Sequence, residues 1–167
     1  VELIYEDGSF SSDFVYESSV RFEGREARDA EDALPASYDE KNQVEHLCVT
    51  LKDNNSALKL ELHYYIYEDC DVITRSAKVI NTEEDKIRLT KAQAACIDFL
   101  HGEFDVISFY GRHAMERNMQ RTSVGHGAFV IGSRRGTSSH QYNPMLILAE
   151  KETTEDAGTC YGMSFVY

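Results

Sequence analysis

The segment SRRGTSSHQYNP, residues 133–144, concentrates cationic and amide side chains that can bind carboxylates or hydroxyl groups. Arginine makes paired hydrogen bonds to carboxylates, and exposed polar groups on an ordered loop suit a contact between domains. An apolar run, Met145 to Ala149, follows directly, so the sequence predicts a polar loop that leads into a strand. The candidate residues for an interdomain contact, in the surroundings of an active site, are Arg134, Arg135, His140, Gln141 and Asn143.

Within this loop, Gly136 permits a backbone geometry that other residues resist, and Ser138 and Ser139 can bond turn amides. We expect a rigid loop that ends at Pro144. Neighbouring arginines alternate in direction, so one is expected to pair with a carboxylate of the same domain while the other stays available for a second surface. The alternative is that all these polar groups satisfy the backbone of the loop itself.

Metal and cofactor chemistry has no support in the pattern of ligating residues. The six histidines form neither an HExxH motif nor a tight His/Cys cluster, and His113 and Glu116 are expected on opposite strand faces. His46 and His63 fall in the solvent-side register of their strands, so we expect both on the surface. The sequence predicts no metal and no cofactor.

Nucleophilic catalysis is also poorly supported. The serines before His140 match no GxSxG elbow, and adjacent residues of an extended chain point to opposite faces. Glycoside hydrolysis needs two carboxyl groups at a set separation, and the sequence leaves such a pair open among Asp98, Glu103, Asp105 and Glu116. No tryptophan is present to stack on a sugar. This absence weakens a self-contained sugar site, and the carboxylate pair stays open.

Charge and composition restrict the partners and the compartment. A net charge of -12 over 167 residues argues against nucleic-acid surfaces and anionic membranes. No apolar stretch approaches the roughly 18–20 residues that span a bilayer. The four cysteines are widely spaced, which predicts reduced thiols and a cytoplasmic protein.

Alternating apolar and polar residues predict strands along most of the chain. In ALKLELHYYIY (57–67) one face carries leucines and the other carries Lys59, Glu61 and His63, and VEHLCVTL (44–51) precedes it across the turn KDNNS, as in a hairpin. Further strands are expected over 72–81, 87–100, 105–111, 113–122, 128–132, 145–149 and 159–167. The stretch 87–100 is ambiguous, because its alanines also suit a helix.

These elements predict an all-β fold, an antiparallel β-sandwich of the supersandwich type with little helix. Residues 1–167 are expected to form one domain. The acidic segment 25–42 is expected to be a long surface loop with one short helical turn. Both termini fall within strand-like runs, so we expect a domain that is truncated at both ends.

Two stretches resemble a known family. LELHYYIYEDCDVITRSAKVIN (60–81) and SRRGTSSHQYNPMLILA (133–149), followed by YGMSFVY (161–167), are similar to the N-terminal β-sandwich domain of the bacterial α-galactosidases of glycoside hydrolase family 36. The order of two arginines, Gly, Ser-Ser-His-Gln and Asn-Pro has no generic structural explanation. Members often have Pro-Phe where this chain has Pro144-Met145, a difference that affects packing.

The resemblance implies a retaining exo-glycosidase that removes terminal α-galactose from melibiose and raffinose-type oligosaccharides. Its catalytic aspartates would belong to a TIM barrel that follows the sandwich, and the Lys-Trp-Asp and Asp-Asp-Gly-Trp motifs of that barrel are absent from this chain. The implied partners are this barrel, further copies of the enzyme in a homo-oligomer, and the α-galactoside substrate. An independent carbohydrate-binding module is the alternative, with Tyr65 and Tyr67 as its candidate exposed aromatics.

Overall fold

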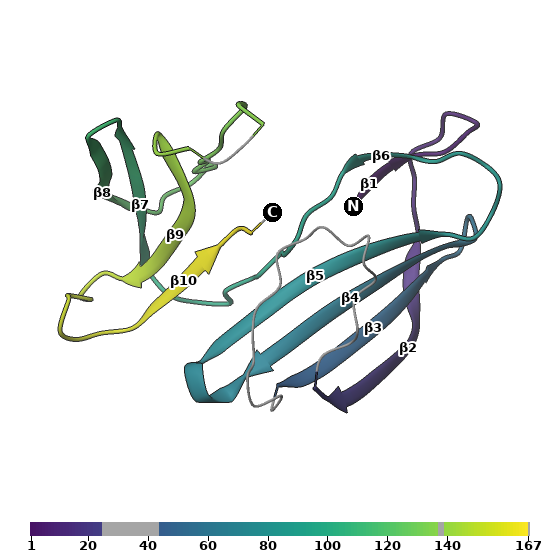
Figure 1. The fold of residues 1–167 in the computed structure, drawn as a ribbon, viewed down its shortest axis with the longest axis horizontal. Helices are drawn as coiled ribbons and strands as arrows, with labels where there is room; N and C mark the ends of the chain where they lie inside the picture. The colour runs from purple at the N-terminus through teal and green to yellow at the C-terminus, as the bar shows by residue number, and fades with distance from the viewer. Residues whose placement is uncertain (25–43, 137–138, 167) are drawn as a thin grey trace. The chain divides into compact units, whose positions relative to one another are not determined.

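The computed structural model describes residues 1–24, 44–136 and 139–166. The chain divides into two compact units, Val1–Ile97 (unit 1) and Asp98–Tyr167 (unit 2), and each is considered by itself (Figure 1). The acidic segment 25–42 lies outside the described residues, so the loop predicted there stays a prediction.

All sheets in the described residues are antiparallel. Unit 1 holds a two-stranded sheet, β1-β6, and a four-stranded sheet in the order β2-β3-β4-β5 (sheet B), and unit 2 holds a four-stranded sheet in the order β10-β9-β7-β8 (sheet C). One 3-10 turn, η1 (Glu68–Cys70), is the helical structure among these residues. The predicted class, an all-β antiparallel β-sandwich with little helix, is confirmed. The strands are β1 (Glu2–Ile4), β2 (Phe14–Glu23), β3 (Glu45–Asp53), β4 (Leu58–Tyr67), β5 (Val72–Asn81), β6 (Arg88–Lys91), β7 (Phe104–Arg112), β8 (Met115–Ser123), β9 (Tyr142–Glu150) and β10 (Cys160–Ser164).

The hairpin predicted from residues 44–67 is confirmed as β3 and β4. Its register pairs Leu51 with Leu60 and Val49 with Leu62, so the apolar residues of both strands share one face. Leu58 and Leu60 are buried on that face. Strand β2, which pairs with β3, was not among the predicted strands, because exposed polar residues interrupt its alternation.

The prediction that His46 and His63 lie on the surface is wrong. They are 0% and 8% exposed, and their rings stack with 3.0 Å between His46 Nε2 and His63 Nδ1. His46 also packs on the ring of Tyr65 at 4.1 Å and against the edge of Phe22. Alternation identifies the residues that share a face, but it does not show whether that second face is covered, and in sheet B both faces carry buried side chains.

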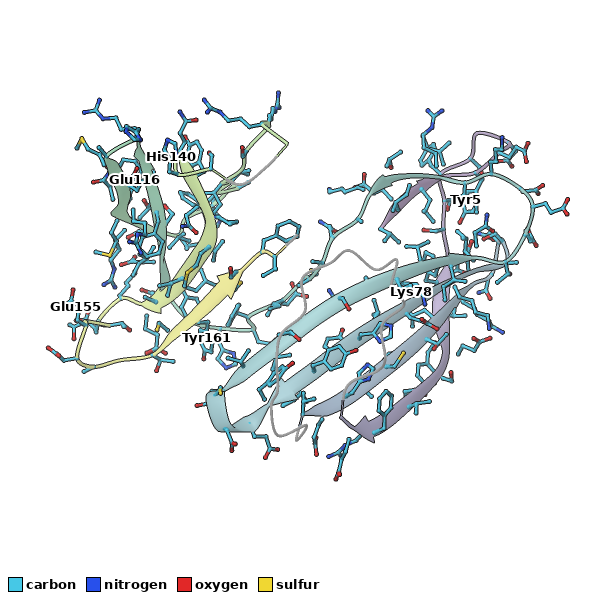
Figure 2. The ribbon with its side chains drawn as sticks, in the orientation of Figure 1. Tyr5, Lys78, Glu116, His140, Glu155 and Tyr161 are labelled. Carbon is cyan, nitrogen blue, oxygen red and sulfur yellow. The ribbon has the colours of Figure 1, made fainter. Side chains whose placement is uncertain are left out.

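Asp53 anchors the β3–β4 turn to other parts of unit 1. Its carboxylate is 5% exposed and accepts hydrogen bonds from the hydroxyls of Tyr5 and Ser56, both at 2.6 Å, and from the Asp13 amide at 2.8 Å. Figure 2 labels Tyr5 just after β1. Burial acts to raise the pKa of Asp53, but these hydrogen bonds outweigh it and hold the pKa below its usual value. The turn therefore ties three segments of unit 1 together.

Two predicted strands are shorter than expected or missing. The stretch 87–100 contains a strand only over β6, and no strand is found over 128–132. The alanines after β6 have small side chains that indicate neither the two-residue period of a strand nor the 3.6-residue period of a helix. In this segment the Arg75 guanidinium donates a hydrogen bond to the Ala94 carbonyl. Phe129 and Val130 instead follow an irregular path, 46% and 80% exposed.

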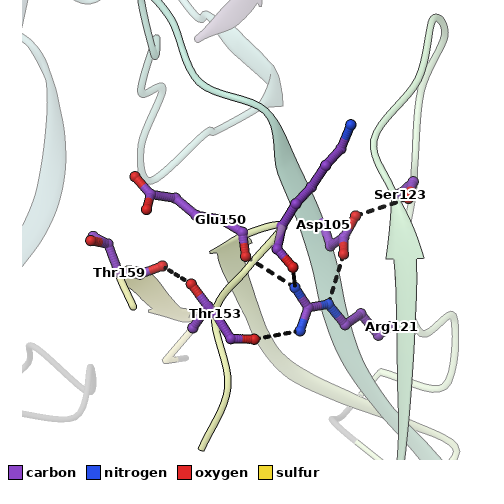
Figure 3. A network of polar contacts seen from close by, with 7 residues as sticks. Asp105, Arg121, Ser123, Glu150, Thr153 and Thr159 are labelled. Atoms are coloured by element: carbon purple, nitrogen blue, oxygen red, sulfur yellow. Dashed lines mark hydrogen bonds and ion pairs between the residues drawn. The ribbon is translucent and has the colours of Figure 1, made fainter. Parts of the chain in front are cut away.

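In unit 2, Arg121 of β8 forms hydrogen bonds that hold the loop between β9 and β10 in place (Figure 3). Its Nε donates to Asp105 Oδ2 at 2.7 Å, and its two terminal nitrogens donate to the carbonyls of Glu150, Lys151 and Thr153 at 2.7–3.0 Å. Hydrogen bonds from Arg121 and Ser123 lower the pKa of Asp105. This network links β7 and β8 to the β9–β10 loop.

The four cysteines, Cys48, Cys70, Cys96 and Cys160, are free thiols. No helix within the described part of the chain is long and apolar enough to cross a membrane.

Candidate functional site

The tip of the β7–β8 hairpin forms one side of the candidate site. A Cβ atom at Gly111 would lie 2.3 Å from the Met115 carbonyl oxygen. The close approach of β7 and β8 at this position therefore requires glycine. Ala114 and Arg117 adopt positive φ angles of 62° and 59°, which are uncommon for residues with a side chain. The Ala114 amide donates to Glu116 Oε1 at 2.9 Å, which closes the turn.

The polar loop of residues 133–141 forms the other side. Gly136 has a φ of 75°, in agreement with the predicted need for glycine, and the Arg135 amide donates to Ser133 Oγ at 3.3 Å. Residues 137 and 138 lie outside the described residues, so the rigidity of the loop and the role of Ser138 stay predictions. The Tyr142 amide donates to the Ser139 carbonyl at 3.2 Å.

The expected end of this loop at Pro144 is wrong by three residues. Strand β9 begins at Tyr142, which pairs with Tyr110 of β7, so Asn143 and Pro144 belong to the strand. Proline is tolerated near a strand end, where a ladder hydrogen bond is not required. The Pro144 carbonyl accepts a hydrogen bond from the Phe165 amide at 2.8 Å.

The five candidate residues fall into two groups by exposure. Arg134, Arg135 and His140 are exposed, whereas Gln141 and Asn143 are half-buried. The expected pairing of one arginine with a carboxylate is not found, because neither Arg134 nor Arg135 forms an ion pair with any residue that the structure describes. These exposed groups therefore point to solvent.

The loop and the hairpin tip lie close together at His140 and Glu116 (Figure 2). Backbone amides of Glu116 and Ala114 lower the pKa of Glu116, and the nearby charges of His140 and Arg117 lower it further. Glu116 is therefore a carboxylate at neutral pH.

This end of unit 2 is basic, although the whole chain is acidic. Residues 110–144 contain five arginines and a single carboxylate, Glu116, in a chain with a net charge of -12. Arg121 is held by Asp105. The other four arginines make no ion pair within the described residues, and we call them the arginine surface: Arg112, Arg117, Arg134 and Arg135.

An open hollow with a volume of about 590 Å³ lies on unit 2. Gln141 is the one predicted site residue that lines it. The other lining residues are Ser108, Tyr110, Gly111, Gln120, Phe129, Val130, Ile131 and Tyr142.

Sequence reasoning missed Arg112, Arg117 and all residues of the hollow except Gln141. A local count of charges over 110–144 would have found the arginines. The hollow had no such signal, because strand pairing and the irregular path of residues 129–131 bring its walls together. No three His, Cys, Asp or Glu side chains of the described residues are grouped as metal ligands.

Comparison with known proteins gives consistent matches over the whole chain. A family model described as the Glycosyl hydrolase family 36 N-terminal domain matches residues 1–167. The bifunctional alpha-galactosidase/sucrose kinase AgaSK of Mediterraneibacter gnavus is 51% identical over 162 residues, which make up 97% of this chain and 17% of that protein.

Solved structures show the same correspondence. The crystal structure of the GH36 alpha-galactosidase AgaA from Geobacillus stearothermophilus matches with a TM-score of 0.93 at 35% identity, over 99% of this chain and 23% of that chain. The galactosidase domain of AgaSK matches with a TM-score of 0.89 at 48% identity. A variant of AgaA has been solved in complex with raffinose. This chain thus spans less than a quarter of the length of these relatives.

Proposed function

Because the chain belongs to the N-terminal domain family of glycoside hydrolase family 36, we propose that it is the non-catalytic N-terminal domain of a retaining α-galactosidase. The whole enzyme would hydrolyse terminal α-galactosyl residues of melibiose and raffinose-type oligosaccharides. The relatives are named alpha-galactosidases, and raffinose is the ligand in one AgaA complex. The domain would pack against the catalytic TIM barrel and take part in assembly of a homo-oligomer.

The arginine surface is the observation that carries the docking role. Lys59, Lys91 and Lys151 each pair with a carboxylate, whereas the four arginines of this surface make no ion pair within the described residues. Arginine is suited to carboxylates on a second protein surface, which it binds through two parallel hydrogen bonds. We infer that carboxylates of the catalytic domain meet this surface.

The chemistry of the carboxylates supports a non-catalytic role. Glycoside hydrolysis needs one carboxyl group with a raised pKa to act as the acid. The pKa values of Glu103, Asp105 and Glu116 are instead lowered, chiefly by hydrogen bonds from Lys151, Arg121 and backbone amides respectively. These three groups act as structural partners, so the aspartates of the barrel would carry the chemistry.

The two aromatic residues expected for an independent sugar-binding module are less exposed than that alternative requires. Tyr65 and Tyr67 are half-buried, and the face of Tyr65 is covered by the ring of His46. A ring that is stacked within the protein is not open to a sugar.

The proposal also covers the domain organisation of the enzyme and its cytoplasmic location. We propose that residues 1–167 form one N-terminal domain, which is followed by the barrel in the whole enzyme. The free thiols agree with the reducing conditions of a cytoplasm.

The docking role predicts separate effects on stability and chemistry. In an α-galactosidase that contains this chain, Arg135→Ala and His140→Ala should lower the thermal unfolding temperature and leave a clearly measurable turnover. The matched control is Arg88→Ala, an exposed arginine of β6, which should change neither. Calorimetry and an aryl α-galactoside assay give both readouts. Loss of turnover by about four orders of magnitude, or ~5.4 kcal/mol, with the fold intact would place the loop in the chemistry instead.

A further inference from the structure

The hollow on unit 2 is built by three separated parts of the chain. Pairing across sheet C places Ser108 opposite Gln120, and Tyr110 opposite Tyr142, so these four residues share one face. The irregular segment 129–131 and Gln141 complete the wall. The hollow has a volume of about 590 Å³ and is open to solvent.

Polar groups in the hollow have unused hydrogen-bonding capacity. Ser108 is 7% exposed, yet its hydroxyl makes no hydrogen bond with another described residue. Gln120 makes one long contact, 3.4 Å from its Nε2 to Thr122 Oγ1, and the amide of Gln141 makes none within the described residues. The Ser108 hydroxyl and the two amides are therefore available for hydrogen bonds with a ligand that enters the hollow.

Three aromatic rings stand beside these polar groups. Tyr110, Phe129 and Tyr142 are 44%, 46% and 52% exposed. No charged side chain is found among the described residues that line the hollow, so neither an anion nor a cation would find a counter-charge. A purely apolar ligand would leave the serine and the amides without partners.

We propose that this hollow binds a neutral saccharide. The C–H faces of a sugar ring pack on Tyr110 and Tyr142, while its hydroxyls bond to Ser108, Gln120 and Gln141. Hydroxyl groups are both donors and acceptors, as the amides and the serine hydroxyl require. The proposed function contributes only the choice of α-galactosides as the first saccharides to test.

The test is a titration of the 167-residue chain with methyl α-galactoside, melibiose and raffinose by isothermal calorimetry. We expect binding of at least one of them, with a dissociation constant raised about tenfold, or ~1.4 kcal/mol, in both Gln120→Leu and Gln141→Leu. The matched control is Gln93→Leu, which removes an exposed amide from unit 1 and should leave the affinity unchanged. Circular dichroism of each variant checks that the sheets are intact.

Two results would overturn the saccharide site: no binding of any of the three sugars, or equal affinities in the Gln120→Leu, Gln141→Leu and Gln93→Leu variants. Either result leaves the docking role untouched, since that role is measured by the thermal stability of the longer enzyme with Arg135→Ala. Failure of the docking test likewise leaves saccharide binding by this chain intact.

Discussion

Asp53 shows how one carboxylate can hold several segments of a small β-rich unit together. It accepts hydrogen bonds from Tyr5, Ser56 and the backbone of Asp13, and it is almost fully buried. Burial and the neighbouring Asp53 charge raise the pKa of Tyr5 to about 12. The sequence offered no sign of this partnership, because the two residues are 48 positions apart.

The Tyr5 hydroxyl predicts a loss of stability at alkaline pH. Its folded-state pKa lies above the unfolded value of about 10, so its contribution is complete below that pH and is lost as the pH rises towards about 12. Tyr5→Phe should cost roughly 1–3 kcal/mol at neutral pH and show a smaller further loss in this window. Urea unfolding at a series of pH values measures both effects.

Tyr161→Phe is the control, because the Tyr161 hydroxyl makes no hydrogen bond with another described residue. Identical alkaline profiles for Tyr5→Phe and the unmodified chain would show that the Tyr5–Asp53 bond has no such role. Asp53 has the opposite dependence: its pKa is lowered, so its contribution is lost in acid, below about pH 4.

At the scale of elements, the close pairing of β7 and β8 is possible because Gly111 has no side chain. A methyl group there would lie 2.3 Å from the Met115 carbonyl oxygen and 2.9 Å from the Glu116 Cα. Gly111→Ala should therefore lower the free energy of unfolding by about 1–3 kcal/mol and disturb the tip that carries Arg112. Gly132→Ala, where a Cβ meets no atom within 4 Å, should have much less effect in the same denaturation experiment. Equal losses would contradict this explanation.

The Arg121 network makes a second prediction for unit 2. Lysine has one terminal nitrogen and cannot reproduce the guanidinium that binds Asp105 and three carbonyls, so Arg121→Lys should destabilise the β9–β10 loop. Faster amide exchange of that loop, measured by mass spectrometry, is the expected result. Lys151→Ala, which removes an exposed ion pair with Glu103, should leave the exchange rates nearly unchanged. Slower or unchanged amide exchange of the β9–β10 loop in Arg121→Lys would contradict this role of the network.

Alternation predicted the elements best where each strand carries one clearly apolar face. The β3–β4 hairpin is the clearest case, since its leucines and valine alternate without interruption. The alternation pattern did not identify β2, because serines and charged residues interrupt its apolar face. It also did not show that His46 and His63 are buried, because the face of the sheet that they occupy carries few apolar residues. The polar loop was found from its composition, but the hollow beside it depends on strand pairing that local patterns do not encode.

For the molecule as a whole, the distribution of charge is the most informative feature. The chain carries a net charge of -12, yet residues 110–144 are basic and leave four arginines without an ion pair among the described residues. Together with membership of the family, this segregation supports a domain that holds a catalytic partner by polar contacts. The proposed contacts should weaken as salt is added, because salt screens exposed charges.

The most direct test of a non-catalytic role is the hydrolysis of an aryl α-galactoside by the 167-residue chain, measured beside a whole α-galactosidase that contains it. The two are compared at equal molar concentration, after circular dichroism has shown the β-sheets of the chain to be formed. We predict release of the aryl group at the background rate for the chain and rapid release by the whole enzyme. Turnover by the chain comparable to that of the whole enzyme would contradict the assignment of the chemistry to the barrel.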